Sequence, residues 1–166
     1  MLNGQRKEKH MAEGHEDNKT DKSTWIWTPN TSYGPFIFGN HLSRTPFVGQ
    51  EVSRRDMGSG DIAIDYLTTI DHQTELEFWN DKLMSVDSNR SFFQKGTECL
   101  FADFQTIKHL FGCEFTVTQE ATLLVATCDE LDLTIFMQTD WTITSISVGV
   151  DPDLYLPPYP NSDDHK

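Results

Sequence analysis

The 166-residue chain lacks long apolar runs and has only three cysteines, and each shortage argues against certain classes of protein. No stretch approaches the roughly 18–20 consecutive apolar residues of a membrane-spanning helix, and the polar N-terminus contains no apolar segment of a secretion signal. Cys99, Cys113 and Cys128 form no Cys-x-x-Cys pair, which is typical of reduced thiols rather than of a disulfide framework or a zinc site. We therefore expect a cytoplasmic protein without a membrane partner.

Recognisable catalytic and nucleotide-binding motifs are also scarce. Gly58-Ser59-Gly60 is not a nucleophile elbow, and the sequence has no Walker or Rossmann glycine pattern. Asp71-His72 could form a base with its orienting carboxylate, but no nucleophile can be named beside it. These shortages favour a protein that is not an enzyme and holds no cofactor.

Basic residues are few in the part of the chain that is expected to fold. From Asp56 to Pro160 there are eighteen acidic and four basic residues, a net charge of −14, while the whole chain carries −13. Such a field repels phosphate and raises the rate of encounter with a basic partner by roughly 10–1000-fold at low salt. We expect a basic protein partner and no nucleic acid; the alternative is that the acidic surface serves only solubility.

Composition and patterning divide the chain into one domain with two tails. Residues 1–24 are almost wholly polar and are expected to be disordered, as are residues 161–166. Residues 25–160 are predicted to form a single globular domain, which suits a chain with 37% hydrophobic residues. Residues 40–60 contain Pro46 and three glycines, so we expect at most a short helix there and mobility around residues 54–60.

The fold class follows from two periodicities. Apolar and polar residues alternate over 75–86 and again over 131–148, and each segment has a turn in its middle, which predicts two similar hairpins. Asp103 and Gly112 are suitable caps for a helix over 103–111, and composition predicts strands at 115–117 and 123–126. The prediction is an α+β fold, an antiparallel sheet built from two similar hairpins with one or two helices on one face. One core should bury Leu76, Phe78, Phe104, Ile107, Leu110, Leu133, Ile135 and Ile146.

The outward positions of these hairpins combine acids with aromatic residues. Apolar anchors surrounded by charge are typical of tight protein interfaces. The predicted partner-binding residues are Glu75, Glu77, Trp79, Asp129, Asp132, Asp140 and Trp141. Three alternatives remain open: the aromatics complete a second core face, Glu75 and Glu77 hold a hard cation or serve a small metal-dependent enzyme, or the chain is an adaptor subunit of a larger assembly.

Several segments together carry a resemblance to a known family. They are Gly-Pro-Phe-Ile-Phe-Gly at 34–39, the stretch 76–86, residues 96–100 leading into the predicted helix, and the hairpin at 131–148. This arrangement resembles the small cytosolic immunity proteins that accompany bacterial polymorphic or contact-dependent growth inhibition toxins. The resemblance implies a non-enzymatic protein that binds and neutralises a cognate toxin domain, often a basic nuclease. Residues 40–60 depart from it, because Pro46 interrupts a region where such proteins often carry a helix.

Overall fold

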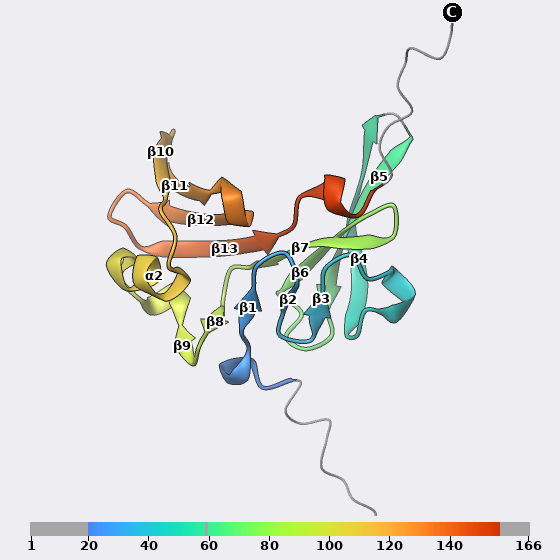
Figure 1. Ribbon diagram of the computed structural model, residues 1–166, viewed down its shortest axis with the longest axis horizontal. Helices are drawn as coiled ribbons and strands as arrows, with labels where there is room; N and C mark the ends of the chain where they lie inside the picture. Colours follow the sequence, from blue (N-terminus) through green and yellow to red (C-terminus); the bar gives the residue numbers. More distant parts are fainter. Residues whose placement is uncertain (1–19, 59, 157–166) are drawn as a thin grey trace, which may run out of the picture.

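The computed structural model describes residues 20–58 and 60–156, and its main element is an antiparallel sheet of eight strands. The strand order is β10-β11-β12-β13-β7-β6-β5-β4, and the sheet is strongly curved (Figure 1). The strands are β4 (Val48–Gly58), β5 (Asp61–Thr68), β6 (Glu75–Trp79), β7 (Lys82–Ser88), β10 (Thr116–Glu120), β11 (Leu123–Cys128), β12 (Leu133–Gln138) and β13 (Ile143–Gly149). The predicted α+β class with an antiparallel sheet is confirmed.

Two meanders of four strands make up this sheet. In each meander, consecutive strands pair with one another, and the last strands, β7 and β13, pair to join the two. The register of that joint places Val86 opposite Val148 and Asp87 opposite Ser147. The segments 75–86 and 131–148 supply the four central strands, so a description of the sheet as two hairpins is incomplete.

Smaller elements cover the apolar face of the sheet. Figure 1 shows the short strands β1 (Trp27–Thr28), β2 (Ser32–Tyr33) and β3 (Phe36–Ile37) below the central strands, beside β8 (Phe93–Gln94), β9 (Thr97–Glu98) and helix α2 (Phe104–Phe111). The remaining elements are the 3-10 turns η1 (Lys22–Thr24), η2 (Leu42–Arg44), η3 (Cys99–Phe101), η4 (Asp129–Leu131) and η5 (Pro152–Leu154).

Helix α2 begins and ends where its sequence indicates. The Asp103 carboxylate accepts a hydrogen bond from the Thr106 backbone N–H at 2.9 Å. Gly112 closes the helix in the left-handed region, with φ of 67°. One such cap contributes about 1 kcal/mol, which matters for a helix of eight residues that is too short to be stable alone.

The core contains the residues expected from the alternation, with one exception. Leu76, Phe78, Phe104, Ile107, Leu133, Ile135 and Ile146 are all buried, whereas Leu110 packs against this core and is only half-buried. Aromatic rings fill the space between the sheet and the covering elements, as in the stack of Tyr33 on Phe92 with ring centroids 4.2 Å apart.

The segment 40–60 contains the short helical turn η2, as allowed, but residues 48–58 form the edge strand β4, which was not predicted. Most of its side chains are exposed, and its pairing with β5 shifts register in three places. A strand that buries neither face regularly shows no period of two in its sequence. Gly49 suits this strand because a Cβ there would lie 2.5 Å from the Leu67 carbonyl oxygen.

The described structure begins before the expected domain boundary. Residues 20–24, which composition assigns to the N-terminal tail, include η1, and Lys22 is held by the domain. Its ammonium group donates to the Asp71 carboxylate at 2.6 Å, to the Thr74 hydroxyl at 2.9 Å and to the Ser91 carbonyl at 2.9 Å. The rest of that tail, and the expected tail 161–166, lie outside the described residues.

The fold predicts a sharp contrast between two phenylalanines. Phe78 is fully buried, with its ring 5.6 Å from that of Tyr66, whereas Phe101 is 86% exposed. Phe78→Ala should lower the free energy of unfolding by about 3–5 kcal/mol, because it leaves a cavity in the core. The matched change Phe101→Ala should cost less than about 0.5 kcal/mol. Urea denaturation measures both, and a loss below about 1 kcal/mol for Phe78→Ala would show that the strand face is assigned wrongly.

Candidate functional site

The second face of the central strands carries a polar depression. Because side chains alternate along a strand, polar residues between the core positions of β6, β7 and β13 point to this face, among them Glu77, Asp87 and Ser147. A hollow of about 330 Å³ is lined by Glu77, Trp79, Asp87, Asp132 and Ser147, among others. A neighbouring hollow of about 230 Å³ contains Glu75 and shares Asp87. We call the combined depression the acidic groove, defined by Glu75, Glu77, Trp79, Asp87 and Asp132.

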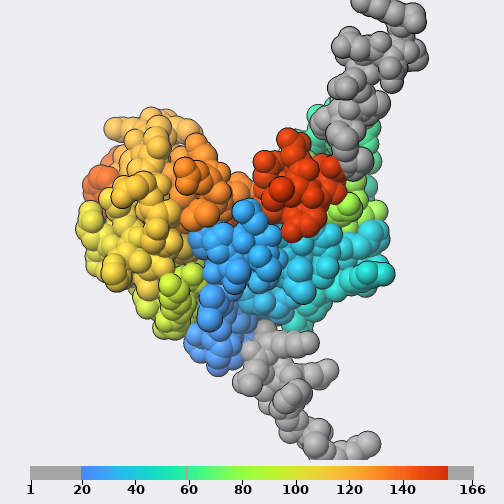
Figure 2. All heavy atoms as spheres, in the orientation of Figure 1, coloured from blue at the N-terminus to red at the C-terminus, as the bar shows by residue number. Residues whose placement is uncertain are grey.

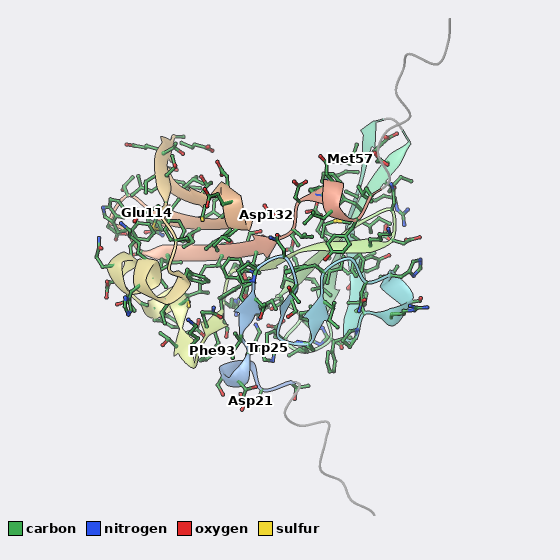
Figure 3. All side chains as sticks on the ribbon, in the orientation of Figure 1. Asp21, Trp25, Met57, Phe93, Glu114 and Asp132 are labelled. Atoms are coloured by element: carbon green, nitrogen blue, oxygen red, sulfur yellow. The ribbon has the colours of Figure 1, made fainter. Side chains whose placement is uncertain are left out.

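The Asp132 end of the groove lies in a notch of the molecular surface. Figure 2 shows the surface hollowed between β12, in orange, and η5, in red. Figure 3 places Asp132 at this notch, whereas Glu114, just before β10, lies away from it. The notch is thus formed by the curvature of the sheet and by the turn that follows β13.

On this face there are two pairs of acids that lie opposite each other on neighbouring strands. One pair is bridged by an arginine and the other is not. Asp65 on β5 lies opposite Glu77 on β6, and the Arg55 guanidinium bridges them, at 3.1 Å from the Asp65 carboxylate and 2.6 Å from that of Glu77. Glu75 lies opposite Asp87, and no basic residue of the described chain lines the hollow that these two share. Like charges directly opposite each other are destabilising, so the second pair has a cost that the first pair avoids.

The surroundings of Asp87 make the ionisation of its carboxyl group unfavourable. Burial raises the pKa of Asp87 to about 6, and the negative charges of Glu77 and Glu75 act in the same direction. Hydrogen bonding from Ser147 opposes the shift, as does the more distant Ser85 hydroxyl at 3.4 Å. A raised pKa in a cleft is common at functional sites, because groups that meet ligands are seldom placed for stability alone.

Asp132 reaches the groove through a close approach of two chain segments. It follows η4 with a positive φ of 49°, and a Cβ on Gly149 would lie 2.5 Å from its carboxylate and 3.0 Å from the Met84 carbonyl oxygen. Glycine at 149 therefore makes room for this carboxylate beside β13. Burial raises the pKa of Asp132, and the charges of Asp151, Glu77 and Asp129 add to the effect.

The structure divides the predicted site residues among different places. Glu75, Glu77, Trp79 and Asp132 meet in the acidic groove. Asp140 and Trp141 line a separate hollow at the turn between β12 and β13, and Asp129 is exposed on η4 and lines neither. Asp87 was missed; its place in the Ser85-Val86-Asp87 alternation was a usable signal, but its meeting with Glu75 depends on register.

The groove is suited to holding a cationic group by electrostatic attraction. Among the described residues the buried indole N–H of Trp79 has no hydrogen-bond partner, and the ring of Trp79 lines the hollow beside the carboxylates. Within the described residues, no group of three or more His, Cys, Asp or Glu side chains is arranged to hold a metal ion. None of the described helices is long and apolar enough to cross a membrane.

Asp71 is occupied by structural contacts and is a poor candidate for a base. Besides Lys22, its carboxylate accepts from the backbone N–H groups of Gln73 and Thr74 and from the hydroxyls of Thr68 and Thr74. Burial alone would raise the pKa of Asp71, but these hydrogen bonds outweigh it and lower the pKa well below its usual value. The neighbouring His72 is exposed.

The raised pKa of Asp87 predicts a pH-dependent stability. An aspartate in an unfolded chain has a pKa of about 3.9, so the cost of ionising Asp87 in the fold begins near pH 4, grows as the pH rises toward 6 and levels off above that. Asp87→Asn should therefore raise the free energy of unfolding by about 1–3 kcal/mol at pH 7.5, and most of this gain should be lost as the pH falls to 4. Chemical denaturation between pH 4 and 7.5 measures this, with the exposed Asp153→Asn as control. A gain that is the same at every pH contradicts the assignment.

Comparison with protein-family models, with curated proteins and with solved structures gives no match for this chain.

Proposed function

We propose that this protein is a non-enzymatic binding protein that receives a basic protein domain in its acidic groove and inhibits it stoichiometrically, as an immunity protein neutralises its toxin. The observation that carries the proposal is the Glu75–Asp87 pair: two facing carboxylates in a hollow that no described basic residue lines. The molecule supplies Arg55 to the equivalent Asp65–Glu77 pair, and a partner would supply the missing cation here.

Electrostatics favours this association twice. The net charge of −13 steers a basic partner toward the molecule, and the groove then provides local complementarity. In the unbound protein, Asp87 bears the cost of a partly buried charge beside other acids. A lysine or arginine placed there would relieve that cost, so part of the binding energy comes from strain already present in the free protein.

The shape of the groove favours a protein side chain over a free metal ion. Its two hollows together hold much more than one ion, and Trp79 adds an aromatic surface that attracts an ammonium or guanidinium group. A hard cation instead needs six or more oxygen ligands in close array. The groove presents spaced carboxylates and serines, which fits several cationic side chains of one surface.

A charge-neutralising triple variant tests the proposal. Glu75→Gln, Asp87→Asn and Asp132→Asn together remove three charges from the groove and leave the Arg55 bridge intact. The partner to use is the basic protein encoded by the neighbouring reading frame, and surface plasmon resonance at several salt concentrations gives both rate constants. The wild-type association rate should fall steeply with salt, and the variant should bind at least about tenfold more weakly.

The matched control removes the same number of charges elsewhere. Glu114, Glu120 and Glu130 are exposed and line neither hollow of the groove, so their replacement by Gln should change affinity less than about threefold. Equal effects of the two triple variants would mean that only net charge matters and that the groove is not the site. Binding that does not respond to salt, or no binding to the neighbouring product, would contradict the proposed partner class.

A further inference from the structure

A separate hollow, of about 420 Å³, lies where η3, the start of α2 and the β12–β13 turn meet. We call it the aromatic hollow, defined by Phe101, Asp103, Phe104, Asp140 and Trp141. It lies on the meander of β10 to β13, beside α2, whereas the acidic groove spans the joint between the two meanders. It is therefore a separate surface.

Two large aromatic side chains of this hollow are turned to solvent. Phe101 is 86% exposed and Trp141 is 48% exposed. The exposure of Phe101 does not come from loose packing of its turn, because its neighbours in η3, Cys99 and Leu100, are buried. Two exposed aromatics that line one hollow are uncommon on a protein that has no use for them, and aromatics are the residues that anchor protein interfaces.

Trp141 is held in an unfavourable backbone conformation. Its φ is 69°, in the left-handed region that bulky residues avoid, at a cost of order 1–3 kcal/mol. Phe47 also has a positive φ, but it is partly buried against the core, which compensates its strain. About half of the Trp141 side chain is exposed, so its burial does not compensate the backbone strain in the same way. Stability therefore does not account for a tryptophan at this position.

The geometry of the turn nevertheless fixes where the Trp141 ring lies. The backbone N–H of Trp141 donates to the Gln138 carbonyl at 2.9 Å, and the backbone N–H of Gln138 donates to the Thr142 carbonyl at 2.9 Å. The indole ring lies 5.5 Å from the ring of Phe104, which is itself buried at the start of α2. The Trp141 ring thus packs on Phe104 on one side, and the rest of the ring is exposed to solvent.

Two ionised and oriented carboxylates flank the aromatic rings. Asp140 accepts from the Thr142 N–H at 2.9 Å, and Asp103 accepts from the Thr106 N–H at 2.9 Å and its hydroxyl at 2.8 Å. These hydrogen bonds lower the pKa of both carboxyl groups, so both are charged at neutral pH. None of the described residues that line the hollow is a basic residue.

We propose that the aromatic hollow receives an arginine side chain of the basic partner. The apolar floor of Leu100 and Ile143 suits the aliphatic stem, and a guanidinium stacks on an indole while it donates to a carboxylate. A second copy of this chain is a poor occupant, because its net charge of −13 would be brought against a surface of the same sign. The inference rests on the proposed function for the cationic character of the partner.

The test uses a small probe, so it does not depend on knowing the partner. The wild-type protein is titrated with N-acetyl-arginine amide, and the four tryptophan indole signals are followed by NMR. The Trp141 signal should shift saturably, with a midpoint on the order of 10 mM, whereas those of the buried Trp25 and Trp27 should stay in place. N-acetyl-citrulline amide has nearly the same shape and no charge, and should give no saturable shift.

Variants locate the probe in the hollow. Phe101→Ala removes an exposed ring, and Asp140→Asn removes a charge while keeping an acceptor for the Thr142 N–H; each should raise the midpoint at least about fivefold. Asp153→Asn, which removes an exposed charge on η5, is the matched control and should leave the midpoint within about twofold.

Most other outcomes overturn the inference, and one supports it. An equal response to the citrulline probe, or no saturable shift at Trp141, would exclude a site for guanidinium in the hollow. A shift of Trp79 alone would place the cation in the acidic groove, which leaves the proposed function intact and removes only the hollow. Trp141 signals that change with protein concentration before any probe is added would show that a second copy covers this surface. If the Glu75, Asp87 and Asp132 triple variant still shifts Trp141 as the wild type does, the hollow acts independently of the groove, which supports the inference.

Discussion

The alternation of apolar and polar side chains along β6, β7 and β13 is the constraint on which the structure depends. One set of positions, including Leu76, Val86 and Ile146, is fully buried under the short strands and α2. The intervening set forms the acidic groove on the opposite face. Because both sets share one backbone, a slip of one residue in any of these strands would remove the core and the groove together. The fold and the candidate site are therefore specified by the same pattern.

Local patterns in the sequence were sufficient for the elements whose two faces differ. The period of two over 75–86 and 131–148, and the capped apolar stripe of 103–111, gave the central strands and the helix, because burial on one face imposes a periodicity that is visible in one segment alone. β4 was missed for the complementary reason. An edge strand with shifted register and exposed side chains imposes no such period, and its glycines resemble those of a loop.

The candidate site was predictable only in part, since its members come from distant segments. The outward acids of each hairpin were visible, but their grouping was not. Glu75 meets Asp87 through the β6–β7 register, and Asp132 joins them only because Gly149 lets β13 lie close. The separation of Asp140 and Trp141 from the groove follows from their position at the far end of the β12–β13 turn. Likewise, composition alone assigns Lys22 to a polar tail, because the groups that bind its ammonium group, on Asp71, Thr74 and Ser91, are distant in the sequence.

The pairing of β7 with β13 also sets an order in time. During synthesis β7 is complete at Ser88, but its partner strand ends only at Gly149. At about 5–20 residues per second, this interval lasts on the order of several seconds. Throughout it, β7 is an open edge with an apolar face, the kind of surface through which nascent chains aggregate. The repulsion between like-charged chains counters that risk. Because the groove exists only once β13 has docked, a truncated or unfinished chain would lack the complete groove, and a molecule that recognised the groove would distinguish finished, folded chains from unfinished ones.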